Sequence, residues 1–143
     1  MSVRDDITPR VIQLRGAFGR VFEQAMDWAE EDFQKEIDAV KWDWPNTTKR
    51  ANGNLAGTIR DIVDLGGLKN SQKREDTGQE RTVFTWTGRD RDGGEKAYAL
   101  EVHDGYTSKG GQRMPARSFT DHAVSELPLI VETMLAREIR SNG

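Results

Sequence analysis

The sequence predicts an α+β fold, because both ends of the chain have the periodicity of helices and the middle has the character of strands. Apolar residues recur every three or four positions from residue 11 to 40 and again from 119 to 139. Residues 82–87 are rich in β-branched and aromatic side chains, and residues 97–103 alternate like a half-exposed strand. We expect a long N-terminal helix, an antiparallel sheet of three to four strands and a kinked C-terminal helix packed on the sheet, in one domain covering residues 1–143.

The composition disfavours several classes of protein. The chain has 21 Lys+Arg against 24 Asp+Glu, a formal charge of -3, and no basic excess of the kind that a dedicated nucleic-acid binder shows. It has no cysteine, which excludes disulfides and thiolate metal sites. Its first ten residues lack the apolar core of a secretory signal, and no apolar run reaches the length of a membrane span. We expect a soluble protein, made in a cytoplasm, that does not bind membranes.

The N-terminal helix is predicted over about residues 9–43. Thr8 and Pro9 suit a helix start, and Pro45 suits a stop. The apolar positions of its stripe are Val11, Leu14, Phe18, Phe22, Ala25, Ala29, Phe33, Ile37 and Val40. A helix of roughly 30 residues exceeds the globular mean of about 11–12, so it should overhang a small domain. Two interpretations stay open: a core helix with a solvated acidic face, or a helix whose excess length packs against a neighbouring copy.

The sheet is predicted over about residues 59–104. Residues 82–87 and 97–103 are expected to form an antiparallel hairpin around Gly93 and Gly94, with a third strand before a turn at Thr77 and Gly78. In the later strand, Tyr98, Leu100 and Val102 would share one face. The stretch after Ile59 fits a helix or a strand on its own pattern, and residues 69–76 are polar enough for an exposed ribbon or loop.

A glycine-rich loop over residues 105–117 is predicted to lead into a C-terminal helix over about residues 118–140. The apolar stripe of that helix contains Phe119, Ala123, Leu127, Ile130, Met134 and Ile139. Pro128 lies inside the stripe and predicts a kink or a break, because proline removes a helical hydrogen bond.

Groups with catalytic potential are sparse. His103 with Glu101 and Asp104 resembles a metal or acid–base cluster in composition, but Asp104 falls on the other strand face or in the turn. His122, the other histidine, lies on a polar helix side. The glycine-rich stretch lacks the spacing of a phosphate-binding loop. We therefore predict no catalytic residue, no metal and no cofactor, and keep a small metal-dependent hydrolase using Glu101 and His103 as the enzymatic alternative.

Local charge suggests a subunit interface. Lys109, Arg113 and Arg117 make the loop basic, and the outer face of the first helix, which includes Glu30 and Glu31, is acidic. A basic loop on one copy would match an acidic helix on the next, which favours orientation and specificity. The alternative is that these charges are simply solvated.

Three segments resemble, in order, those of the neck and tail-completion proteins of long-tailed bacteriophages, a family of lambdoid tail components encoded just before the major tail gene. Residues 52–59 (NGNLAGTI) resemble a polar turn of that family, residues 98–105 (YALEVHDG) its most specific motif, and residues 115–119 (PARSF) the start of its last helix. Asn52, Ala56 and Ser118 depart from the usual threonine, basic residue and proline. The motif positions are Leu55, Ile59, Tyr98, Ala99, Val102, His103, Gly105, Pro115, Ala116, Arg117 and Phe119.

The resemblance implies a structural role in the virion, without catalysis. It implies a homo-oligomeric ring, with six copies expected, that contacts the head–tail connector on one side and the tail terminator or tail tube on the other, with DNA as passing cargo. A tail terminator that caps the tube is the nearest alternative. The resemblance also favours a strand over residues 61–74. Tyr98 and Val102 would then pack the sheet on the helices, Gly105 would turn the chain, and Phe119 would anchor the last helix in the core.

Overall fold

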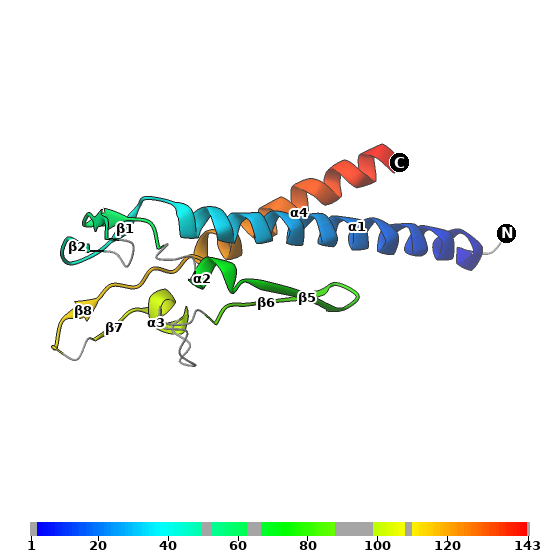
Figure 1. The fold of residues 1–143 in the computed structure, drawn as a ribbon. Coiled ribbons are helices and arrows are strands. Elements are labelled where there is room, and N and C mark those ends of the chain that lie inside the picture. The colour runs from blue at the N-terminus through cyan, green and yellow to red at the C-terminus, as the bar shows by residue number, and fades with distance from the viewer. Residues whose placement is uncertain (1–2, 50–52, 63–66, 88–98, 108–109, 143) are drawn as a thin grey trace.

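The computed structural model describes residues 3–49, 53–62, 67–87, 99–107 and 110–142, with side chains described from Gln13 to Ser141 within those ranges. The helices are α1 (Val3–Asp38), α2 (Gly67–Asn70), α3 (Ala99–Asp104) and α4 (Asp121–Asn142). The strands are β1 (Trp42–Asp43), β2 (Thr48–Lys49), β3 (Leu55–Ala56), β4 (Ile59–Arg60), β5 (Lys73–Gly78), β6 (Arg81–Thr85), β7 (Tyr106–Thr107) and β8 (Arg113–Met114). In Figure 1, α1 runs along most of the molecule, and the small strands β1, β2, β7 and β8 lie beyond its C-terminal end, opposite the chain termini.

The α+β class is confirmed, but the single sheet of three to four strands is wrong. The described strands form separate antiparallel pairs, namely β1–β4, β2–β3, β5–β6 and β7–β8. Among these described pairs, β5–β6 alone has more than two residues in each strand. The molecule is therefore organised around its two long helices.

Helices α1 and α4 pack side by side in antiparallel orientation. Arg20 on α1 pairs with Glu138 near the end of α4, with 2.6 Å between Nε and Oε1. At the other end of the contact, Asp32 lies 2.9 Å from His122 in the first turn of α4. The buried face of α1 repeats every four residues and consists of Ala17, Val21, Ala25, Ala29, Phe33 and Ile37. Three small alanines on this stripe let the two helix backbones approach closely.

The core lies under the C-terminal half of α1. Phe33 meets the rings of Phe84 and Trp86 edge to face, each at 5.0 Å between centroids. Trp86 in turn meets Phe119 at 5.2 Å. This run of aromatic rings connects α1, β6 and the segment before α4, so burial of Phe119, expected from sequence, is confirmed.

The first helix begins at Val3 instead of near Pro9, and it ends five residues earlier than predicted. It ends at Asp38, and Trp42 belongs to β1 instead. The indole Nε1 of Trp42 donates to the carbonyl of Glu36 at 2.7 Å, and the amide of Ile62 donates to the carbonyl of Ile37 at 2.9 Å. These donors satisfy carbonyls that the last helical turn leaves unpaired, so the chain turns back while Trp42 stays against the helix end.

The predicted strand over residues 97–103 is wrong, because residues from Ala99 to Asp104 form α3. The helix buries Ala99 and Val102, which lie three residues apart on one face. Leu100, which alternation had placed on the same face as Val102, is 73% exposed. The predicted hairpin between residues 82–87 and 97–103 is therefore absent, while Tyr98, Gly93 and Gly94 lie outside the described residues.

The β5–β6 hairpin, which precedes α3 in the chain, agrees more closely with the prediction. Strand β6 covers most of the predicted segment and pairs with β5, whose outward polar side chains make the exposed ribbon expected from sequence. Its turn lies at Gln79 and Glu80, two residues after the predicted position. A strand over residues 61–74 is wrong in part: Gly67–Asn70 is helical, β5 begins at Lys73, and residues 63–66 are outside the described ranges.

The C-terminal helix is confirmed, but its partner is different from the one predicted. It begins at Asp121 and continues as one helix through Pro128 to Asn142. It packs against α1 instead of lying on a sheet, and Leu127 reaches the cluster that also contains Phe84 and Trp86. Within the described residues, no helix is both long and apolar enough for a membrane span.

Candidate functional site

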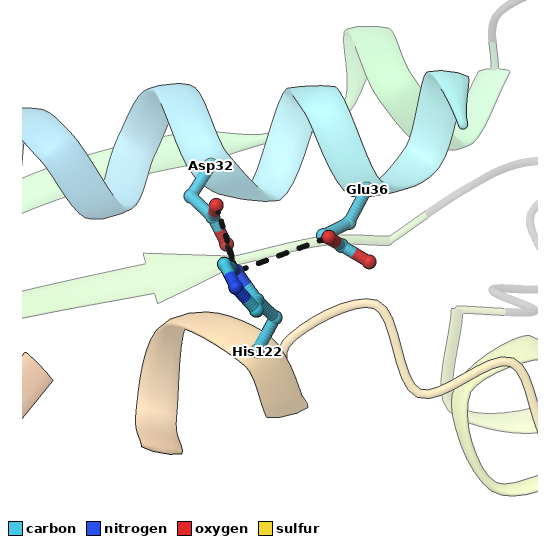
Figure 2. A group of neighbouring side chains, drawn as sticks. All are labelled: Asp32, Glu36 and His122. Atoms are coloured by element: carbon cyan, nitrogen blue, oxygen red, sulfur yellow. Dashed lines mark hydrogen bonds and ion pairs between the residues drawn. The ribbon is translucent and has the colours of Figure 1, made fainter. Parts of the chain in front are cut away.

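A polar cluster joins α1 to α4 where the two helices meet at the start of α4. Asp32 and Glu36 lie one turn apart on α1, and His122 is the second residue of α4. Figure 2 shows both carboxylates directed at the imidazole. The Nδ1 atom of His122 lies 2.9 and 3.0 Å from the two oxygens of Asp32 and 3.9 Å from Oε1 of Glu36.

The three side chains differ in their access to water. Asp32 is only 7% exposed, although carboxylates are rarely buried without a partner. The side chain of Glu36 is also largely covered, whereas about half of the imidazole of His122 faces solvent. The cluster thus has a covered carboxylate side and an open histidine side.

The electrostatics of the cluster favour a positive charge at His122. The hydrogen bond to Asp32 raises the pKa of His122 above its ordinary 6.5, and the negative charges of Asp32, Glu36 and Glu126 act in the same direction. Desolvation opposes this shift without cancelling it. Lys41 forms an ion pair with the second carboxylate oxygen of Glu36, which partly balances the negative charge.

One imidazole nitrogen and two carboxylates make a mixed nitrogen–oxygen donor set. Their ligand atoms all lie within 4.8 Å of one another. Sequence reasoning missed this group because Asp32 and His122 are 90 residues apart. The available signal was the four-residue spacing of Asp32 and Glu36, combined with the antiparallel packing that two long amphipathic helices favour.

His103 lies elsewhere and has other partners. Its Nδ1 is 2.7 Å from Asp104 and its Nε2 is 2.7 Å from the hydroxyl of Thr120. Its ring also meets Phe119 edge to face at 5.4 Å. Since Glu101 and His103 are two residues apart on a helix, their side chains leave α3 in different directions. The geometry therefore does not bring together the pair that the hydrolase alternative requires.

The motif residues around Gly105 fix the end of α3 against the segment that leads into α4. Gly105 has φ of +80°, and its amide donates to the carbonyl of Glu101 at 2.8 Å, which ends α3. A Cβ there would lie 2.7 Å from the carbonyl oxygen of Met114, so only glycine fits. Arg117 then donates its amide to Val102 at 2.9 Å and leads to the buried Phe119.

The other motif positions are spread over the surface and the loops. Leu55 is 82% exposed, and Ile59 is also exposed. Ala99 is buried, Pro115 is half-buried and Ala116 is exposed. Ala99 therefore belongs to the core with Val102, whereas Leu55, Ile59 and Ala116 leave their side chains at the surface.

The charged residues predicted at a subunit interface fall into two groups. Arg117 is buried, and its guanidinium lies 4.3 Å from the ring centroid of Trp44. Glu30 pairs with Arg74 of β5 at 2.9 Å. Both therefore make contacts within the subunit. Arg113 and Glu31 are exposed, and Lys109 lies outside the described residues.

An open groove runs between the N-terminal half of α1, the β5–β6 hairpin and the end of α4. Its volume is about 1160 Å³. Its apolar lining consists of Leu14, Phe18, Phe22, Leu135 and Ile139, and its polar rim includes Arg15, Glu23, Asp76 and Glu80. Leu14 is 51% exposed, so the groove presents apolar surface to solvent.

Comparison with known proteins gives no relative: no family model, no curated protein and no solved structure matches this chain.

Proposed function

We propose that this chain is a structural subunit of the neck of a long-tailed bacteriophage, where copies form a ring, with six copies expected, that joins the head connector to the tail. The observation that carries the proposal is the apolar groove beside α1. Contiguous apolar surface of this kind on a small domain is characteristic of a protein–protein contact. The phage assignment itself rests on the resemblance of residues 52–59, 98–105 and 115–119 to the neck and tail-completion family.

The occupant of the groove is the N-terminal overhang of α1 from a neighbouring copy. Because α1 and α4 are antiparallel and Arg20 pairs with Glu138, the end of α4 at Asn142 lies opposite about residue 16 of α1. Residues 3–12 therefore extend beyond α4. Figure 1 shows this end of α1 projecting past the end of α4. Val3, Ile7 and Val11 recur every four residues in this segment, the spacing of one helix face.

Such a contact joins two different surfaces, an overhang on one copy and a groove on the next. Repetition of a head-to-tail contact closes a ring when the rotation between copies closes. The exposed Arg113 and Glu31 remain available for charge complementarity between copies or with the connector and tail proteins. A tail terminator would use the same geometry, and the position of the ring in the particle distinguishes the two roles.

The self-association is tested on the purified full chain by native mass spectrometry and light scattering. Ile7→Asp in the overhang and Leu14→Asp in the groove should each weaken association at least about tenfold, because a carboxylate would be buried without a partner. Leu129→Asp is the matched control, since Leu129 is exposed on α4 but does not line the groove. Circular dichroism checks that each variant is folded.

Mixing the two variants gives a sharper result. A head-to-tail contact needs one intact overhang and one intact groove, so Ile7→Asp and Leu14→Asp together should form dimers that neither forms alone. A wild-type chain that stays monomeric at high concentration, or equal effects of Leu129→Asp and Leu14→Asp, would refute the ring.

The location is tested in the phage that encodes the chain. Deleting its gene should leave filled heads and finished tails unjoined, and electron microscopy of normal particles should place the ring at the head–tail junction. Density on the tube end of free tails would favour the terminator. Infectious particles that assemble normally without the protein would rule out both roles.

A further inference from the structure

We propose that Asp32, Glu36 and His122 form a binding site for a divalent transition-metal ion of the zinc class, which clamps the start of α4 to α1. This inference is independent of the assembly role proposed above. It adds a ligand to a chain for which the sequence predicted none.

The donor set selects the class of metal. One imidazole nitrogen with two carboxylates suits zinc and its neighbours, which accept nitrogen and oxygen ligands at about 2.0–2.2 Å. Calcium and magnesium favour sites made of oxygen ligands alone. Three protein ligands with a solvent-facing side leave a further coordination position for water. The half-exposed face of His122 provides that access.

The geometry needs only a small adjustment. A tetrahedral ion with bonds of about 2.1 Å places its ligand atoms roughly 3.4 Å apart. The Nδ1 atom of His122 is 2.9 Å from Asp32 and 3.9 Å from Glu36, values on either side of that separation. Each distance differs from that separation by about 0.5 Å, the first being too short and the second too long.

The surroundings support a cation at this position, and the metal would replace the proton that His122 shares with Asp32, because a ligating imidazole must be neutral. Asp32 is held in a covered position by α1, and Glu36 lies one turn further along the same face. Glu126, one turn after His122 on α4, adds a third negative charge nearby. Lys41 competes for Glu36, but its side chain is about half exposed, so it can return to solvent when a metal binds.

The site also lies where a clamp would matter. Asp32 and His122 connect segments 90 residues apart, at the end of the α1–α4 contact nearest the aromatic core. A metal that binds the folded chain and not the unfolded one stabilises the fold through that binding. Zinc should therefore raise the unfolding midpoint of the protein.

The test uses the full chain, freed of metal with a chelator and then dialysed. Calorimetric titration with zinc chloride should show one site per chain, and zinc should raise the midpoint of thermal unfolding. His122→Gln and Glu36→Gln should each weaken zinc binding at least about tenfold, since even outer-shell partners of a metal contribute tenfold or more. Cobalt provides a spectroscopic readout, because its visible absorption reports nitrogen and oxygen ligands in a four-coordinate site.

His103→Gln is the matched control, because His103 also lies beside a carboxylate, 2.7 Å from Asp104, but outside the cluster. It should bind zinc as the wild type does. Wild-type protein that takes up no zinc, or binding that survives His122→Gln, would overturn the proposal, as would binding lost in His103→Gln. The groove variant Leu14→Asp should bind zinc normally, which separates this result from the fate of the ring.

Discussion

The carboxylate of Asp32 accepts a hydrogen bond from His122 at 2.9 Å, and this contact joins the two long helices beside the aromatic core. Asp32 is nine-tenths buried, whereas His122 remains half exposed. The pair thus places a charged group under the protein surface and leaves its partner at the surface. The stability of the α1–α4 contact should depend on that partner.

His122→Ala in metal-free buffer should lower the free energy of unfolding by about 1 kcal/mol, because it leaves the covered carboxylate of Asp32 without its donor. The value lies at the lower end of the usual range since water can enter from the exposed side. Urea unfolding measures the change. Ser125→Ala, on the same helix and exposed, should shift stability by less than about 0.5 kcal/mol. Equal effects of both changes would show that the pair contributes nothing specific.

Gly105→Ala should destabilise the protein more than Gly111→Ala. The two glycines have similar φ angles, +80° and +83°, so both substitutions carry the left-handed backbone penalty of about 1 kcal/mol. At Gly105 the new methyl group would also lie 2.7 Å from the carbonyl oxygen of Met114, whereas at Gly111 it meets nothing within 4 Å. Thermal unfolding of the two variants isolates the steric part. A smaller loss for Gly105→Ala than for Gly111→Ala would contradict the close approach.

Pro128→Ala should stabilise the chain, because Pro128 lies in the interior of α4 and is exposed. Proline in a helix interior costs up to about 3 kcal/mol relative to alanine. Leu129→Ala, at the next and also exposed position, should be close to neutral. Chemical denaturation compares them. Loss of stability in Pro128→Ala would mean that the packing of α4 on α1 depends on the geometry that proline imposes.

Arg117→Lys should lower stability by about 0.5–2 kcal/mol, because the planar guanidinium of Arg117 lies over Trp44 and lysine cannot stack in the same way. Arg60 lies 4.8 Å from the same ring and holds the neighbouring loop through a 2.9 Å bond to the carbonyl of Asn46. Arg113→Lys is the control and should be neutral, because the side chain of Arg113 is exposed on β8. Urea unfolding measures both changes.

The β5–β6 hairpin should weaken in acid. Thr82 donates to Asp76 at 2.7 Å, and this bond, helped by Arg74, lowers the pKa of Asp76 below its ordinary 3.8. A carboxyl with a lowered folded-state pKa contributes stability above its unfolded pKa and loses it as the pH falls through the folded value. The protection of the hairpin amides, measured as their exchange relative to the intrinsic rate at each pH, should therefore fall below about pH 4 in the wild type. Asp76→Asn should remove that pH dependence, and an unchanged profile would contradict it.

Local pattern was sufficient for some elements and insufficient for others. The four-residue stripe of α1, the stripe of α4 and the β-rich segment of β6 are long or strong enough to be read directly from sequence. The segment around Leu100 is too short for that. Small alanines on the face opposite Leu100 and Val102 make its alternation weak. Tertiary contact selects the helix that buries Ala99 and Val102.

The cluster of Asp32, Glu36 and His122 could not be predicted from the sequence for a related reason. His122 lies on a polar side of α4, which by itself indicates solvent. Only the antiparallel register of α1 and α4 brings it to Asp32, and that register depends on which alanines face the other helix. Similarly, nothing local indicates that Trp42 turns back to cap Glu36 and shortens α1.

The N-terminal end of α1 and the C-terminal end of α4 lie at one pole of the molecule, and the short strand pairs β2–β3 and β7–β8 lie at the other. A molecule bound at the helical pole therefore leaves the pole with β2–β3 and β7–β8 exposed. The two poles are therefore separate surfaces, and α1 is the long element that connects one to the other.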